Sequence, residues 1–312
     1  MSDEAKTPRP RRTQTLATAL LSLWSPGLGH VYLGAWRRAL VIAASILLAL
    51  AAIGWLFTSP ARPRLTIGLG LGIYACLLAA ATLDAVRTAR RTGGPTADAR
   101  RRWLLCVLFY LGLTGLGALE ATAIRAFWAQ AFRVPTGSME PTLLVGDCFF
   151  VDKRAYRRRE PRRGEVVVFR HPRDPRQTYV ERLVGLPGDS VEVRDNVLTV
   201  NGVRFTSDLL PGAEAQPSNV RGPVRRATLG GQAYLVLDIP TRPRRDLPAV
   251  RVPEGLYLVL GDNRNNSADS RFWGGVTRDA LIGPVTHVYY SHDQETGRIR
   301  WRRVGLRLAI PD

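Results

Sequence analysis

The stretch VPTGSMEPTL, residues 134–143, separates two parts of the chain that differ in composition. Long apolar runs precede it, and short alternating segments divided by turns follow it. Pro135 and Pro141 fix φ and withhold backbone donors, so the stretch forms neither a regular helix nor a central strand. A stiff loop of this kind can present Ser138 as a nucleophile. Because Ser, Thr and Pro are also the residues of ordinary turns, the loop alone leaves both interpretations open.

Three apolar runs in the N-terminal part are long enough to cross a bilayer, namely Ala39–Phe57, Leu65–Leu83 and Trp103–Ile124. Thr15–Gly34 is also apolar, but Ser25, Pro26 and Gly27 interrupt it. A re-entrant or interfacial segment is therefore expected there as readily as a span. We predict a basic cytoplasmic tail at residues 1–14 and a membrane region at 15–126 with three or four apolar segments.

The arginines indicate how these segments are oriented. The connection between residues 87 and 102 is dense in arginine, and the positive-inside rule places it in the cytoplasm. If Thr15–Gly34 does not cross, there are three spans and the N-terminus is inside. If it crosses, there are four spans and the N-terminus is outside. Both arrangements put residues 127–312 outside the cytoplasm.

The formal net charge of +18 rests almost wholly on arginine, since Lys6 and Lys153 are the only lysines. Such a charge favours an anionic membrane surface or nucleic acid as a partner. The basic residues flank apolar runs and are not interleaved with aromatic residues, so we expect the lipid bilayer and no nucleic acid. The three cysteines and four histidines show no disulfide framework and no zinc spacing, so no metal or other cofactor is expected.

After residue 130 the pattern alternates with period two, which indicates strands. Strands are predicted at Val166–Phe169, Thr178–Val184, Ser190–Val200, Leu256–Leu260 and Ile299–Leu308. Asp195-Asn196 should split Ser190–Val200 into a hairpin, and Asn201-Gly202 is a second hairpin signal. Residues 205–253 are polar and rich in Pro, Gly and Arg, which is typical of an insertion. The expected fold is an N-terminal α-helical membrane region followed by a mainly-β domain at 127–312.

Four further stretches follow the serine loop in order, and they are Gly146–Val151, Arg163–Phe169, Tyr179–Asp189 and Gly261–Arg271. The last is dense in carboxylates, amides and guanidinium groups that can satisfy one another's hydrogen bonds. It predicts either a structural turn network or a support behind a functional site.

With these five regions in order, residues 127–312 resemble bacterial type I signal peptidases, which are membrane-bound serine endopeptidases that remove signal peptides. The motifs are S-M-x-P-T, the G-D turn, R-G-[DE]-V-V-V-F with R-x-V-G-x-P-G-D, and G-D-N-R-x-N-S-x-D-S-R-x-W-G. The resemblance implies a signal-peptidase-like β fold, preprotein signal peptides as substrates and contact with the secretion machinery. It also implies a bacterial cytoplasmic (inner) membrane location, multi-pass, with the catalytic domain on the periplasmic or extracellular side. The N-terminal region is longer than the one or two spans usual in the family.

The resemblance also implies roles for individual residues. Ser138 is the nucleophile, and the Ser138 amide and the Thr136 hydroxyl hold the oxyanion. Ser267 matches a hydroxyl that orients the general base, and Asp269 and Arg271 match a supporting ion pair. The shallow apolar pockets for small substrate side chains correspond to Phe132, Val134, Leu143 and Val180.

One position departs from the family pattern. The general base of the family is a lysine directly before the arginine of R-x-V-G-x-P-G-D, and here that residue is Glu181. Arg182 is no substitute, because a guanidinium group does not deprotonate. Strand alternation puts Glu181 and Arg182 on opposite faces, so we do not expect them to pair.

Three interpretations of Glu181 remain open. First, a desolvated Glu181 with a raised pKa accepts the serine proton. Second, the chain binds preproteins or signal peptides without cleaving them. Third, another base such as His171 serves instead. A self-cleaving serine–lysine repressor, which has a related β core, is disfavoured because membrane spans stand where a DNA-binding module belongs.

Overall fold

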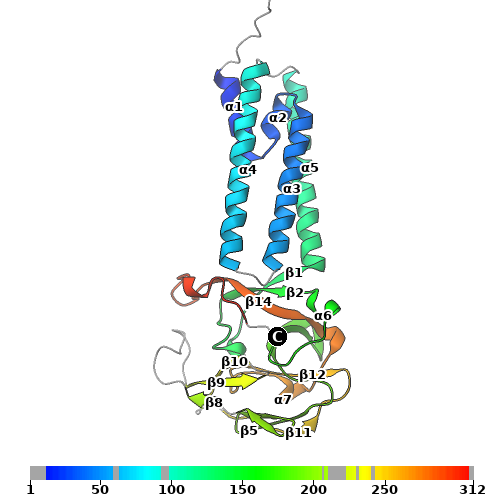
Figure 1. Ribbon diagram of the computed structural model, residues 1–312, viewed down its shortest axis with the longest axis vertical. Coiled ribbons are helices and arrows are strands. Elements are labelled where there is room, and N and C mark those ends of the chain that lie inside the picture. Colours follow the sequence, from blue (N-terminus) through cyan, green and yellow to red (C-terminus); the bar gives the residue numbers. More distant parts are fainter. Residues whose placement is uncertain are drawn as a thin grey trace, which may run out of the picture. The chain divides into compact units, whose positions relative to one another are not determined.

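The computed structural model describes residues 12–58, 63–92, 98–205, 207–209, 223–229, 232–239 and 243–308. The chain divides into two compact units, Met1–Ile124 and Arg125–Asp312. The described residues of the first unit are mainly helical, and those of the second form mainly strands (Figure 1). The predicted fold class, a helical apolar region followed by a mainly-β domain, is confirmed.

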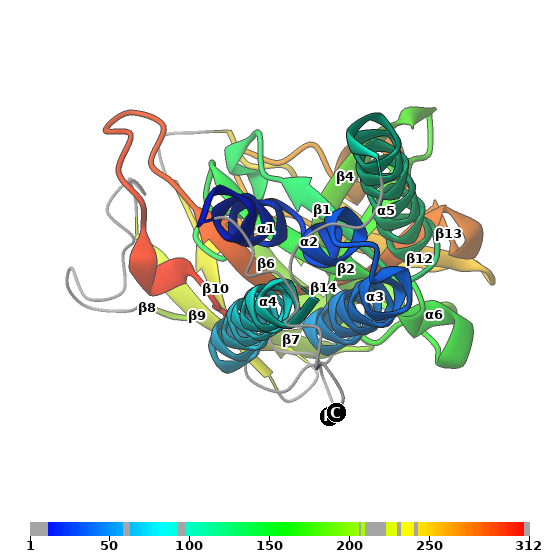
Figure 2. The same cartoon turned by 90° about the horizontal axis from the view of Figure 1, so that it is seen from above.

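The described helices of the first unit are α1 (Arg12–Trp24), α2 (Leu28–Tyr32), α3 (Trp36–Thr58), α4 (Pro63–Thr92) and α5 (Ala99–Phe127). Figure 2 looks along them and shows α3 beside α4. Three of the described helices are long and apolar enough to cross a membrane, with windows at Trp36–Ile53, Gly72–Thr92 and Arg100–Phe127. Thr15–Gly34 is not one helix, because the interruption predicted at residues 25–27 ends α1 after 13 residues.

The short helix α2 is buried along its whole length. Gly29 allows α1 to approach it closely, since a Cβ there would lie 2.2 Å from Ser22 Oγ and 2.5 Å from the Thr18 carbonyl oxygen. On another side His30 Nε2 forms a hydrogen bond with Asp84 of α4 at 2.9 Å. A polar contact of this kind is strengthened where the surroundings have a low dielectric constant. A small residue and a polar pair thus hold α2 against α1 and α4.

Gly29→Ala tests the close approach. The added Cβ would collide with the backbone of Thr18, so the substitution should destabilise the helical unit, although alanine favours helix by about 1 kcal/mol over glycine. Gly115→Ala in α5 is the matched control, because nothing lies within 4 Å of a Cβ there. Thermal unfolding in detergent should show a lowered midpoint for Gly29→Ala and an unchanged or raised one for Gly115→Ala. Equal midpoints would contradict the packing described.

The described strands of the second unit are β1 (Ala129–Arg133), β2 (Asp147–Asp152), β3 (Val166–His171), β4 (Asp174–Gly185), β5 (Ser190–Arg194), β6 (Val197–Val200), β7 (Val203–Phe205), β8 (Ser207–Leu209), β9 (Val224–Leu229), β10 (Gln232–Leu237), β11 (Leu247–Arg251), β12 (Leu256–Leu260), β13 (Val276–Thr277) and β14 (Leu281–Ser291). One sheet has the order β1-β2-β14-β3-β4-β12-β13. The others are β10-β9-β8 and β11-β5-β6-β7. The short helices are α6 (Ala155–Arg158), α7 (Ser270–Trp273) and the 3₁₀ turns η1 (Gly137–Met139), η3 (Arg278–Ala280) and η4 (Trp301–Arg303).

Strand β3 explains why its sequence is continuously apolar. Val166 and Val168 belong to the core cluster beneath the serine loop, whereas Val167 and Phe169 belong to a cluster on the opposite face. A strand buried on both faces needs apolar residues at every position. Four other predicted strands are present in β4, β5, β6 and β12, and the hairpin turn at Asp195-Asn196 has the expected positive φ angles of 50° and 64°.

The sequence prediction missed one central strand and assigned one strand wrongly. The prediction did not include β14, which lies between β2 and β3. Its sequence contains Gly283 and Pro284, which are unusual in a central strand. The register shifts along β14 accommodate them, and a Cβ at Gly283 would lie 2.2 Å from the Asp152 carbonyl oxygen. The strand predicted at Ile299–Leu308 is instead η4 with isolated bridges at Ile299 and Arg307. In this segment Arg300 donates to the Val145 carbonyl, and Arg303 donates to Asp147 and to the Thr142 carbonyl.

The predicted insertion at residues 205–253 has its own strands. Strands β8, β9 and β10 form the three-stranded sheet, and β11 pairs with β5. The apolar side chains of β9 and β10 join the core cluster that β5, β6 and β12 also line. Residues 206, 210–222, 230–231 and 240–242 lie outside the described part of the chain.

Candidate active site

The serine loop is held from below by its apolar residues and from the side by Asn263. Met139 and Leu143 are completely buried in the core cluster beneath the loop. The backbone N–H of Asn263 donates to the Ser138 carbonyl at 2.9 Å, and its side-chain amide donates to the Gly137 carbonyl at 3.0 Å. Ser138 itself is half-buried in η1. The turn that follows β12 therefore fixes the backbone of the candidate nucleophile.

Gly261 allows this turn to approach the serine. A Cβ at residue 261 would lie 2.8 Å from the Ser138 carbonyl oxygen and 2.3 Å from Ser267 Cβ. Close packing therefore leaves no room for a side chain at residue 261, although the backbone angle there is not unusual.

A buried ion pair joins β4 to the same turn. The guanidinium of Arg182 donates to both carboxylate oxygens of Asp262 at 2.8 Å and 2.6 Å, and it also donates to the Gly164 carbonyl at 2.7 Å. Thr142 of the serine loop donates to Asp262 at 2.5 Å. The Arg182 side chain lies over the ring of Tyr234, with 4.2 Å between the guanidinium carbon and the ring centroid. Asp262 therefore connects β4, the serine loop and the turn after β12.

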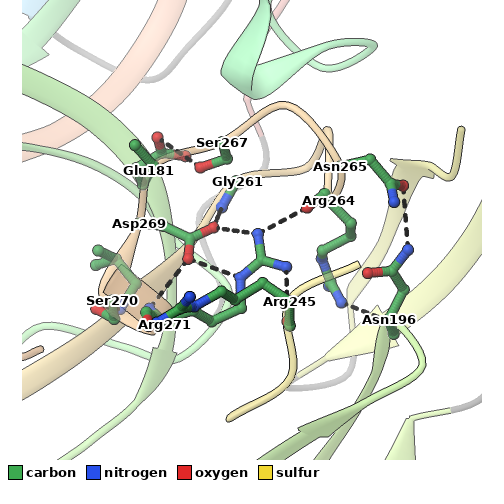
Figure 3. Close-up of polar contacts among 12 residues, drawn as sticks. Glu181, Asn196, Arg245, Gly261, Arg264, Asn265, Ser267, Asp269, Ser270 and Arg271 are labelled. Carbon is green, nitrogen blue, oxygen red and sulfur yellow. Dashed lines mark hydrogen bonds and ion pairs between the residues drawn. The ribbon is translucent and has the colours of Figure 1, made fainter. Parts of the chain in front are cut away.

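A second buried ion pair supports the turn (Figure 3). Arg271 donates to Asp269 at 2.8 Å and 2.7 Å, and both side chains are fully buried. Asp269 also accepts from the backbone N–H of Gly261 at 3.0 Å, and Arg271 donates to the Arg264 carbonyl at 2.7 Å. The ion pair predicted at Asp269 and Arg271 is thus present, with its backbone contacts on the segment that touches Ser138.

Glu181 is buried beside Ser138 and Ser267. The Ser267 hydroxyl donates to Glu181 Oε1 at 3.2 Å (Figure 3), and 1% of Glu181 is exposed. Ser138 lies near enough for its hydroxyl to lower the pKa of Glu181, yet Glu181 Oε2 has no partner of hydrogen-bonding geometry among the described residues. Arg182 pairs with Asp262 and not with Glu181, and strand alternation predicted the absence of a Glu181–Arg182 pair.

The pKa of Glu181 is raised well above its ordinary value. Burial is the main cause, the Asp269 carboxylate adds to it, and Asp262 contributes in the same direction. Hydrogen bonding by Ser138 and Ser267 opposes the shift without reversing it. No cation forms an ion pair with Glu181 among the described residues, whereas each of the two aspartates has an arginine. The site therefore favours the neutral, protonated form of Glu181.

The remaining predicted residues fall into two groups. Phe132, Val134, Leu143 and Val180 all contribute to the cluster beneath the serine loop, with Phe132 and Val180 only partly buried. Thr136 is exposed and precedes η1 without a side-chain capping bond.

The alternative base His171 lies elsewhere, as does the one lysine of the β unit, Lys153. The ring of His171 packs against Tyr179 and Trp273, and its Nδ1 accepts from the backbone N–H of Arg173. Lys153 donates to the carbonyls of Arg125 and Ala126. No contact of either residue with Ser138 is present in the described residues, so the geometry does not favour His171 as the base.

Sequence reasoning gave no role to Thr142, Asp262 and Asn263, although the structure places them against the serine loop. The density of polar residues between 261 and 271 was the available signal. That signal does not reveal which group each polar residue binds, because partners such as Asp262 and Thr142 are 120 residues apart in the chain. In the part of the chain that is described, no group of three His, Cys, Asp or Glu side chains is arranged to hold a metal ion.

The family model for signal peptidase, peptidase S26, matches residues 100–290. The chain belongs to this signal peptidase family. A probable signal peptidase I-2 of Synechocystis sp. is 38% identical over 180 residues, which cover 55% of this chain and 69% of the relative. Signal peptidase I of Aquifex aeolicus is 34% identical over 205 residues, with 55% and 80% covered. A crystal structure of a signal peptidase I from Enterococcus faecalis is 31% identical over 41% of this chain and 98% of that chain, with a TM-score of 0.27.

Membership of the family supports a serine endopeptidase that removes signal peptides. Signal peptidase I proteins are bacterial membrane proteins, and the three apolar helices are consistent with this class.

Glu181→Gln should change how stability depends on pH. An unfolded glutamate loses its proton near 4.5, whereas folded Glu181 keeps it to a higher pH because its pKa is raised. In that window the folded state binds more protons than the unfolded state, so the free energy of unfolding falls as pH rises. Glutamine does not titrate, so the stability of the variant relative to wild type should increase with pH, by at most about 1.4 kcal/mol per pH unit.

Denaturant unfolding of both proteins in detergent, between about pH 5 and pH 8, measures this difference. Contributions from other titrating groups cancel in the comparison as long as the substitution leaves them unchanged. A stability difference that does not vary with pH would show that Glu181 is ionised in the folded protein as readily as in the unfolded chain.

Proposed function

We propose that this protein is a membrane-bound signal peptidase I in which Ser138 attacks the scissile carbonyl of exported preproteins. Its partners are preprotein signal peptides, the lipid bilayer and the secretion machinery. The basic connection between residues 87 and 102 lies in the cytoplasm, and the β unit that begins near residue 127 lies on the periplasmic or extracellular side. The main support for the chemistry is the position of the buried Glu181 carboxyl group beside Ser138.

In the proposed reaction, ionised Glu181 removes the Ser138 proton as Oγ bonds to the carbonyl carbon of the substrate. The electron pair of that carbonyl moves to its oxygen, and the resulting oxyanion takes hydrogen bonds from the Ser138 amide and the Thr136 hydroxyl. Protonated Glu181 then returns the proton to the leaving amine. Water repeats the sequence to release the acyl group from Ser138. Ser267 holds one carboxyl oxygen of Glu181 throughout.

The substrate side of the proposal concerns the apolar cluster beneath the loop. Phe132 and Val180 are partly buried against it, so they present apolar surface beside Ser138 for small substrate side chains. Val134 and Leu143 are almost completely buried and would form the floor beneath that surface.

A second candidate function is binding of signal peptides without cleavage. The raised pKa of Glu181 favours it specifically, because a protonated carboxyl group cannot accept the serine proton. The two candidates differ in what happens when pH rises, since only a peptidase gains activity as Glu181 ionises.

Cleavage of a preprotein by the full chain, measured from roughly pH 6 to pH 10, distinguishes the candidates. For a peptidase that uses Glu181, the rate should rise about tenfold per pH unit until the pKa of Glu181 is reached. Ser138→Ala should abolish cleavage, and Glu181→Gln should remove the pH-dependent rise. Wild-type cleavage that persists in Ser138→Ala would eliminate the proposed nucleophile.

Glu181→Lys provides the matched comparison for the binding candidate. It restores the lysine that the family resemblance implies, in a site where two aspartates stabilise a positive charge. If preprotein binds to wild type, and cleavage is seen only in Glu181→Lys at every pH, then the binding function is correct. Ser138-dependent turnover by wild type would rule that function out.

A further inference from the structure

A cationic cavity of about 260 Å³ lies on the β unit away from Ser138. Its charged lining residues are Lys153, Arg157, Arg170, Arg278 and Asp279. Arg157 belongs to α6, which contacts β14 (Figure 1). The apolar lining comes from Leu281 and Ile282, the first residues of β14. The cavity thus combines four basic side chains and one acidic side chain with a small apolar wall.

The positive charge of this cavity is largely uncompensated. Arg278 is engaged, because it forms an ion pair with Glu160 and donates to the Tyr156 carbonyl. Arg157 and Arg170 form no ion pair among the described residues, and Asp279 pairs with neither of them. Unpaired arginines around a cavity are suited to a phosphate group, which they can bind with two parallel hydrogen bonds.

Lys153 connects this cavity to the end of a candidate membrane span. Its ammonium group donates to the carbonyls of Arg125 and Ala126 at 3.2 Å and 2.9 Å. These residues form the last turn of α5, whose span-like window ends at Phe127. The next residue is Trp128, which lies beneath the Arg154 guanidinium at 5.1 Å. Tryptophan is enriched at the boundary between lipid and water, where phospholipid phosphates also lie.

We propose that this cavity binds the phosphate of an anionic phospholipid headgroup. Arg157 and Arg170 contact the phosphate, Lys153 adds charge from the end of α5, and Leu281 and Ile282 contact the first carbons of the lipid. The proposal rests on the proposed membrane anchoring through α5, but it does not depend on peptide cleavage. It assigns an affinity for lipid to residues that the proposed peptidase chemistry does not use.

The test is equilibrium binding of short-chain phosphatidylglycerol to the full chain in neutral detergent, with phosphatidylcholine and inorganic phosphate as parallel probes. Each basic residue near an anionic surface contributes about 1 kcal/mol, so removing two should weaken binding about twenty- to thirtyfold. Arg157→Ala combined with Arg170→Ala is the variant. Arg176→Ala combined with Arg226→Ala removes the same charge from exposed positions outside the cavity lining and is the control.

Selective binding of phosphatidylglycerol that is lost in the cavity variant and kept in the control supports the proposal. Equal loss in both variants overturns it in favour of a general effect of net charge. Inorganic phosphate that binds as tightly as phosphatidylglycerol overturns it in favour of a free-phosphate site. Because no cleavage is measured, failure of lipid binding is distinguishable from failure of the peptidase function. Circular dichroism of each variant checks that the β unit remains folded.

Discussion

The buried ion pair between Arg182 and Asp262 is the contact on which the candidate site depends. It joins β4, which carries Glu181, to the turn that holds the Ser138 backbone, and Thr142 of the serine loop donates to the same aspartate. Removing one member of such a pair typically costs about 3–5 kcal/mol, because the other charge stays buried without a partner. The ion pair therefore helps to position the serine loop, together with the buried side chains of Met139 and Leu143 and the hydrogen bonds from Asn263.

The sequence predicted the strands and turns of the site better than the side-chain contacts that join them. Alternation and turn residues located β4 and the hairpin at Asp195-Asn196, and alternation separated Glu181 from Arg182 correctly. It failed for β14, because bulges let a glycine and a proline occupy a central strand. The role of Asp262 could not be read from spacing, since its partners come from segments far apart in the chain. Which carboxylates lie near Glu181 is likewise a property of the fold.

The surroundings of residue 181 favour positive charge over negative. Asp269 and Asp262 both oppose ionisation of a carboxylic acid there, and burial adds to the effect. The same two aspartates would stabilise a cation at residue 181, although each already forms an ion pair with its own arginine. The charged form of a lysine at this position would thus be favoured by the neighbouring carboxylates and opposed by burial. An ionised glutamate is opposed by both, and the pKa of Glu181 is raised as a result.

The negative charges of Asp269 and Asp262 change the pH range in which Glu181 can act as a base, but they do not prevent it from accepting a proton. The aspartates that resist ionisation of Glu181 also favour the step in which ionised Glu181 takes a proton, since that step discharges it. A stronger base transfers protons more readily, but fewer molecules carry it in ionised form at neutral pH. A lysine base is affected in the same direction, because the aspartates stabilise the charge that it gains when it accepts the proton. The two residues respond oppositely to burial instead, since burial raises the pKa of a carboxyl group and lowers that of an ammonium group. Burial and the aspartates therefore act together on Glu181, whereas for a lysine at the same position they would oppose each other.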